Sequence, residues 1–138
     1  MFLVYPAVFH KCNDGEGYFI TFPDFEGASQ AETENECVYM AQDFLGINLY
    51  DMLVENQKFP KPTSIKDVTI ENDGYTIVED SFISLVGIDI YKYAKEMEQV
   101  TVRKNVTIPS YLNEMGKNHN INFSKLLTEA LEKEFEIE

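Results

Sequence analysis

The stretch TVRKNVTIP, residues 101–109, decides how the C-terminal part of this 138-residue chain folds. One side of the stretch is mostly apolar and holds Val102, Lys104, Val106 and Ile108. The other side is polar and holds Thr101, Arg103, Asn105 and Thr107. A period of two predicts a β-strand with two unlike faces. Pro109 fits the first turn of a following helix, where its missing amide costs nothing.

Two short helices are predicted after this strand. The first contains the apolar residues Leu112 and Met115 and is expected to end at Gly116 and residues 118–120. Asn122 is a good N-cap for the second. The apolar positions of the second helix recur at helical spacing: Phe123, Leu126, Leu127, Ala130, Leu131 and Phe135. The order is therefore strand, helix, turn, helix.

A unit of this kind is too small to fold alone. A single strand leaves its backbone amides and carbonyls unpaired, and two short helices enclose too little core. If two chains pair their strands antiparallel, the ladder closes and four helices share one core. We therefore expect a homodimer whose stability depends on protomer concentration.

The segment resembles the ribbon-helix-helix family of bacterial repressors. The resemblance implies that the paired strands enter the major groove of operator DNA and read base edges with Arg103, Asn105 and Thr107. The amides at Asn122, Phe123 and Ser124 would then hold a phosphate. The alternative is that these polar residues only solvate an exposed strand. Residues 99–138 contain 5 Lys/Arg and 6 Asp/Glu, an unusual balance for a DNA-binding module.

Residues 1–98 are predicted to form a separate α+β domain, with the boundary near Glu98 and the C-terminal module at 99–138. Six strands are expected in turn, at 2–10, 18–22, 27–31, 67–70, 75–78 and 82–90. A helix is expected between Thr33, which with Glu36 forms a capping-box signature, and residue 55 or 56. Its two apolar stripes are Val38, Ala41, Leu45, Leu49 and Met52, and Met40, Phe44 and Ile47. Proline-rich residues 59–63 form a surface connection, and residues 90–97 one or two helical turns.

The acidity of the chain is concentrated in this first domain. Residues 1–98 contain 18 Asp/Glu and 6 Lys/Arg, within a formal net charge of −13 for the whole chain. Such a surface repels nucleic acid and attracts basic partners. The simpler interpretation is that it keeps the protein soluble.

Catalytic, metal-binding and membrane signals are weak. Cys12 and Cys37 do not form a metal-ligand pattern and are expected to be free thiols. His10 and His119 lack neighbours that would suggest a triad. We expect no cofactor, no metal and no membrane span, and a cytoplasmic location.

Three segments of the first domain occur together in one family: YPAVF at 5–9, GYFITFPD at 17–24 and the capped helix after Gly27. They resemble the HicB antitoxin family, which implies a truncated ribonuclease-H-like fold. The resemblance also implies a HicA-like partner, a small basic mRNA-cleaving ribonuclease toxin, and repression of the shared operon. We expect the toxin contacts among the carboxylates around the first hairpin: Asp14, Glu16, Asp24 and Glu26.

Two other functions are compatible with the sequence. The first domain of a plain repressor would sense a small ligand, and no toxin gene would lie beside it. A metal-dependent nuclease would need several carboxylates converging on two ions, and Asp24 and Asp43 are candidate ligands, although such pairs arise by chance in so acidic a domain. Because the first strand, residues 2–10, contains no Asp or Glu, we expect that the chain is not an enzyme.

Overall fold

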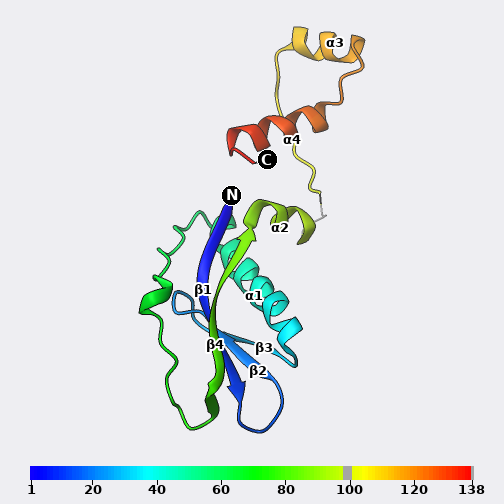
Figure 1. The fold of residues 1–138 in the computed structure, drawn as a ribbon. Helices are drawn as coiled ribbons and strands as arrows, with labels where there is room; N and C mark the ends of the chain where they lie inside the picture. Colours follow the sequence, from blue (N-terminus) through cyan, green and yellow to red (C-terminus); the bar gives the residue numbers. More distant parts are fainter. Residues whose placement is uncertain (98–100, 138) are drawn as a thin grey trace. The chain divides into compact units, whose positions relative to one another are not determined.

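The computed structural model describes residues 1–97 and 101–137, which form two compact units, Met1–Ala94 and Lys95–Glu138. Over these residues the fold is α+β, with one four-stranded antiparallel sheet and four α-helices (Figure 1). The predicted α+β class is confirmed. The boundary predicted near Glu98 lies outside the described residues. No helix in the described ranges is long and apolar enough to cross a bilayer.

The sheet has the strand order β3-β2-β1-β4, and all neighbouring strands are antiparallel. Strands β1 (Phe2–Cys12), β2 (Tyr18–Thr21) and β3 (Ala28–Ala31) lie close to their predicted positions. The β1–β2 hairpin closes through a hydrogen bond of 3.1 Å from Cys12 N to Gly17 O. Gly15 and Gly17 have φ values of +104° and +88°, which side-chain-bearing residues rarely adopt. These two glycines therefore allow the tight turn.

Strand β4 (Thr76–Asp89) joins two segments that the sequence predicted as separate strands. Its pairing with β1 shifts between Phe9 and Lys11, where extra residues of β4 bulge out. Ser81 stabilises the bulge, since its hydroxyl accepts from Lys11 N at 2.9 Å and donates to Ile77 O at 2.8 Å. Because the bulge interrupts the apolar pattern of this continuous strand, the sequence pattern predicted two separate strands.

The strand predicted at Asp67–Ile70 is wrong. Ile65–Asp67 instead forms a single 3-10 turn, η1, and the residues after it are irregular. Asp67 N bonds to Ser64 O at 2.9 Å and Val68 N to Ile65 O at 3.2 Å. Local hydrogen bonds thus satisfy backbone groups that a strand would have offered to a neighbour.

Helix α1 (Glu34–Val54) covers one face of the sheet (Figure 1). As predicted, Thr33 caps it, with its hydroxyl accepting from Glu36 N at 3.3 Å. The Glu36 carboxylate accepts from Glu32 N at 3.0 Å rather than from the cap residue itself. The two interactions together fix where the helix begins.

The core of the first unit lies between α1 and the sheet. Its fully buried residues on α1 recur every four positions: Cys37, Ala41, Leu45 and Leu49. They pack with Tyr5, Ala7 and Phe9 of β1, Ile20 of β2, and Val86 and Ile88 of β4. The prediction that Val38 and Ile47 are buried is wrong, because the buried stripe is narrower and passes through Cys37 instead. Both residues are about half exposed.

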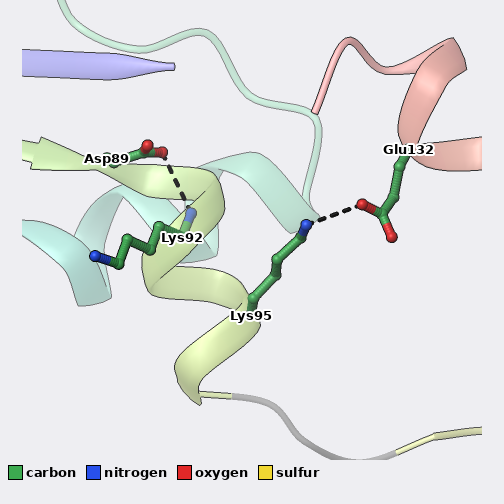
Figure 2. Close-up of polar contacts among 4 residues, drawn as sticks. All are labelled: Asp89, Lys92, Lys95 and Glu132. Carbon is green, nitrogen blue, oxygen red and sulfur yellow. Dashed lines mark hydrogen bonds and ion pairs between the residues drawn. The ribbon is translucent and has the colours of Figure 1, made fainter. Parts of the chain in front are cut away.

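Helices α2 (Ile90–Met97), α3 (Ser110–Asn118) and α4 (Phe123–Glu134) follow. Asp89 Oδ1 accepts from Lys92 N at 3.3 Å at the start of α2 (Figure 2). In the second unit, Lys95 Nζ and Glu132 Oε2 form an exposed ion pair at 2.9 Å, also drawn in Figure 2. Exposed pairs of this kind contribute between 0 and about 1 kcal/mol.

Helix α3 ends at Asn118, inside the end predicted at Gly116 and residues 118–120, and Gly116 itself is still helical. A Cβ at Gly116 would come within 2.3 Å of the Phe123 ring. The glycine therefore marks a close contact between α3 and the start of α4, and not a helix end. Asn122 caps α4 as predicted, with Oδ1 accepting from Lys125 N at 3.0 Å.

Candidate partner-binding surfaces

The C-terminal unit exposes apolar side chains that a folded protein normally buries. Residues 101–109 belong to no helix or strand, and the Val102 side chain is 86% exposed. The other exposed apolar residues lie along the same segment and both helices: Val106, Ile108, Leu112, Met115, Ile121, Phe123, Leu126, Leu127, Leu131 and Phe135. Exposed apolar area of this extent is typical of a surface that another protein covers.

Part of this apolar surface is hollowed. A depression of about 450 Å³ is lined by Ile108, Leu112, Met115, Gly116, His119, Ile121, Phe123 and Leu126. His119 contributes little polarity, because its Nδ1–H donates to Met115 O at 2.7 Å. The depression therefore suits apolar side chains.

The predicted DNA-reading residues are all on the surface. Arg103, Asn105 and Thr107 are exposed in the irregular stretch before α3. No strand of the described residues pairs with this stretch, and the alternating arrangement of a ladder needs a second strand. Their side chains are accessible, but the single chain does not align them.

The start of α4 is open to an anion. Asn122, Phe123 and Ser124 are exposed, and the first amides of a helix have no acceptor within the helix. Asn122 Oδ1 satisfies Lys125 N, and Asn122 O accepts from Leu126 N at 3.0 Å. The helix dipole and the side chain of Lys125 both favour negative charge there.

Four carboxylates surround a hollow in the first unit. Asp14 and Glu16, which the sequence identified, lie in the β1–β2 turn and line a hollow of about 670 Å³. Glu32 and Glu36, which it missed, line the same hollow from the turn before α1 and from its first turn. The capping-box pattern placed Glu36 at the start of a helix, but only the order of the strands brings that helix end beside the first hairpin.

The other two predicted contact residues differ from these. The Asp24 carboxylate accepts from Thr63 N at 3.0 and 3.2 Å and from Thr63 Oγ1 at 2.7 Å. These bonds hold the proline-rich connection against the turn after β2, so Asp24 has a structural role. Glu26 is exposed and lies outside the lining of the hollow.

The residues that a nuclease would need are not brought together. Asp24 is bonded to Thr63, whereas Asp43 accepts from Tyr93 Oη at 3.4 Å. Burial, reinforced by Asp43, raises the pKa of Tyr93 to about 12. Within residues 1–97 and 101–137, no group of three or more His, Cys, Asp or Glu side chains is arranged to hold a metal ion.

Cys37 and His10 are also structural. Cys37 is fully buried, and burial raises the pKa of its thiol. His10 stacks on Phe19 with ring centroids 4.2 Å apart, and its Nε2 lies 2.9 Å from Thr21 Oγ1. Burial lowers the pKa of His10, with Asp73 acting in the opposite direction. Neither residue adjoins a nucleophile–base pair.

Residues 5–131 match the family model described as the HicB-like antitoxin of bacterial toxin–antitoxin systems. The chain is 29% identical to a chain of a toxin–antitoxin complex from Streptococcus pneumoniae, over 97% of this chain and 99% of that one, with a TM-score of 0.62. It also shares its fold with the antitoxin HicB of Burkholderia pseudomallei, at 17% identity over 94% and 96% of the two chains and a TM-score of 0.51. No curated protein matches the chain significantly.

Proposed function

The chain belongs to the HicB-like antitoxin family of bacterial toxin–antitoxin systems, and we propose that it neutralises a small basic HicA-type mRNA-cleaving toxin and represses its own operon. The first unit would bind the toxin, and a dimer of the C-terminal unit would bind operator DNA. As a member of an antitoxin family, the chain is not an enzyme. The observation that carries the proposal is the family match, because it spans both units.

The charge of the first unit supports binding to a basic toxin. Asp14, Glu16, Glu32 and Glu36 meet around one hollow, in a domain where carboxylates outnumber basic residues by 18 to 6. Opposite charges accelerate the encounter of two proteins and orient it, most strongly at low salt. We propose that this acidic hollow attracts the toxin and contacts its basic surface, with Glu26 at the margin.

Charge reversal at the hollow tests this role. Asp14→Lys with Glu16→Lys should slow association with the basic protein encoded beside this gene by about tenfold at low salt, through lost electrostatic steering. Surface plasmon resonance at two salt concentrations measures the effect. Asp67→Lys with Glu71→Lys, an exposed pair with the same charge change outside the hollow, is the control. Equal association rates for the two double variants would exclude the hollow.

The exposed apolar face of the C-terminal unit supports a dimer. In the part of the chain that the structure describes, residues 101–109 have no strand partner, and the apolar residues of α3 and α4 are exposed. A second copy would supply both at once, since its strand closes the ladder and its helices close the core. In this ribbon-helix-helix arrangement Arg103, Asn105 and Thr107 would alternate on the exposed face of the ribbon, toward base edges.

Operator binding provides the second test. Arg103→Ala should weaken binding to the promoter region of the chain's own operon by about 1 to 3 kcal/mol and relax its base preference. Lys117→Ala, which removes the same charge at the end of α3, is the control. Electrophoretic mobility shifts with point-substituted operators measure both. Unchanged affinity and selectivity in Arg103→Ala would contradict the assigned reading strand.

A further inference from the structure

The free edge of β4 is a surface that neither the acidic hollow nor the C-terminal dimer uses. Among the described residues β4 pairs only with β1 and forms one margin of the sheet. Ile90 N bonds to Met1 O at 3.1 Å, and alternate residues of an antiparallel strand point their amides to opposite sides. The N–H groups of Ile83, Leu85 and Gly87 therefore point away from β1.

Contacts within the first unit agree with this direction. The carbonyl of Gly87 accepts from Gln42 Nε2 at 2.9 Å, which requires that carbonyl to face away from β1. The Leu85 carbonyl accepts from the Ser84 hydroxyl at 3.2 Å. No acceptor for the amides of Ile83 and Leu85 is found in the described part of the chain. Unpaired amides on an edge strand are a ready template for another strand.

Apolar side chains flank these amides on the sheet face opposite α1. The register pairs Leu85 with Pro6 and Gly87 with Val4, which brings Phe2, Val4 and Leu85 onto one surface. They are 67%, 36% and 54% exposed, respectively. The Phe2 ring lies over Gly87, where a Cβ would come within 2.4 Å of it. The edge therefore combines amides that have no acceptor among the described residues with three exposed apolar side chains.

The bulge limits how far another strand could extend. Glu79 and Asp80 are exposed within it. They separate the short pairing of Thr76 and Ile77 with β1 from the longer pairing of Phe82–Asp89. Carboxylates at a bulge discourage pairing on that part of an edge. The available template is thus Phe82–Asp89, which we call the upper half of β4.

The negative charge around β4 indicates which class of partner would bind its edge. Residues 76–89 contain three carboxylates and no Lys or Arg, and the whole first unit is strongly acidic. Pairing with a second copy of this unit would bring like charges together, whereas a basic partner gains from the same field. A segment with apolar residues at alternate positions and Lys or Arg near Glu79 and Asp80 fits the edge.

We infer that the upper half of β4 binds an extended segment of the basic toxin as a fifth strand of the sheet. This inference rests on the proposed function, which supplies the basic partner. Backbone hydrogen bonds to Ile83 and Leu85 hold the segment, and Phe2, Val4 and Leu85 cover its apolar side chains. The acidic hollow attracts the toxin and contacts its basic surface, and the edge adds backbone hydrogen bonds to the complex.

Two measurements on the full-length chain and the basic protein of the adjacent gene test the inference. Leu85→Lys should weaken the complex at least tenfold, because it removes the apolar contact and adds a like charge. Val38→Lys is the matched control, since Val38 is 53% exposed but lies on α1; it should change affinity less than twofold. Thermal unfolding of each free variant checks that the fold is intact.

Residue-resolved amide hydrogen exchange separates strand addition from side-chain contact alone. On binding, the amides of Ile83 and Leu85 should exchange at least tenfold more slowly, relative to the amide of Val86, which faces β1. Unchanged exchange, or wild-type affinity in Leu85→Lys, would overturn the inference and leave the antitoxin function standing. Failure of the wild-type chain to bind the adjacent protein would instead overturn the proposed function.

Discussion

The sequence placed Asp24 among the expected toxin contacts, and the fold gives its carboxylate partners that the sequence did not reveal. Asp24 belongs to an acidic cluster along the chain, but its carboxylate is bonded to the backbone and hydroxyl of Thr63, 39 positions away. A side chain used in this way stabilises a loop and is less available to a partner. The neighbouring Glu26 is exposed and has no such bond among the described residues.

A pair of substitutions separates these two carboxylates. Asp24→Ala should lower the free energy of unfolding of the first unit by about 2 kcal/mol, the usual range for hydrogen bonds to a charged group. Glu26→Ala should change it by less than about 0.5 kcal/mol, as for most surface positions. Urea denaturation measures both. Equal stabilities would mean that the bonds to Thr63 contribute nothing net.

Because His10 is partly buried, the free energy of unfolding of the first unit should depend on pH. Because burial lowers the folded-state pKa of His10 below the ordinary value near 6.5, the folded protein takes up a proton less readily than the unfolded chain. Stability should therefore be complete above pH 6.5 and decrease as the pH falls through 6.5 toward the lowered value. His10→Phe, which keeps a ring against Phe19, should lack this decrease. Urea denaturation between pH 7.5 and 5.5 compares the two, and parallel curves would contradict the assignment.

At the scale of elements, the sequence predicted what is decided locally. Thr33 and Asn122 cap their helices as expected, since a cap depends on a few neighbouring residues. Ala41, Leu45 and Leu49 form the buried side of α1, as the periodicity indicated. The bulge in β4 was missed because it depends on a distant contact, the bond from Lys11 N to the Ser81 hydroxyl. The strand predicted at residues 67–70 failed for a local reason, since short-range hydrogen bonds form a 3-10 turn at Ile65–Asp67.

For the candidate surfaces, too, the sequence identified residues that are close together in the chain and missed those that only the fold brings together. Asp14 and Glu16 were found because they are adjacent in sequence to a recognisable turn. Glu32 and Glu36 were missed, since only the sheet order brings the start of α1 to the same hollow. The outward direction of the Ile83 and Leu85 amides depends on the register of β4 against β1, which the sequence does not reveal.

For the whole molecule, the two units should differ in how their stability depends on concentration. The first unit encloses its own core, with Tyr5, Phe9, Leu45 and Leu49 almost completely buried. In the second unit, Gly116 is the only described residue of α3 or α4 that is buried. A unit whose core forms only with a second copy is stabilised by mass action as protomer concentration rises.

Thermal unfolding by circular dichroism should accordingly show two transitions. The midpoint of one should rise with each tenfold increase in protein concentration, and the other should stay constant. Leu131→Lys should abolish the concentration-dependent transition, because it places a charge in the shared core, and sedimentation should then report a monomer. Thr128→Lys adds the same charge at an exposed position of α4 outside the apolar stripe, and should leave the dimer intact. A wild-type chain that sediments as a monomer throughout the micromolar range would show that its apolar face is covered in some other way.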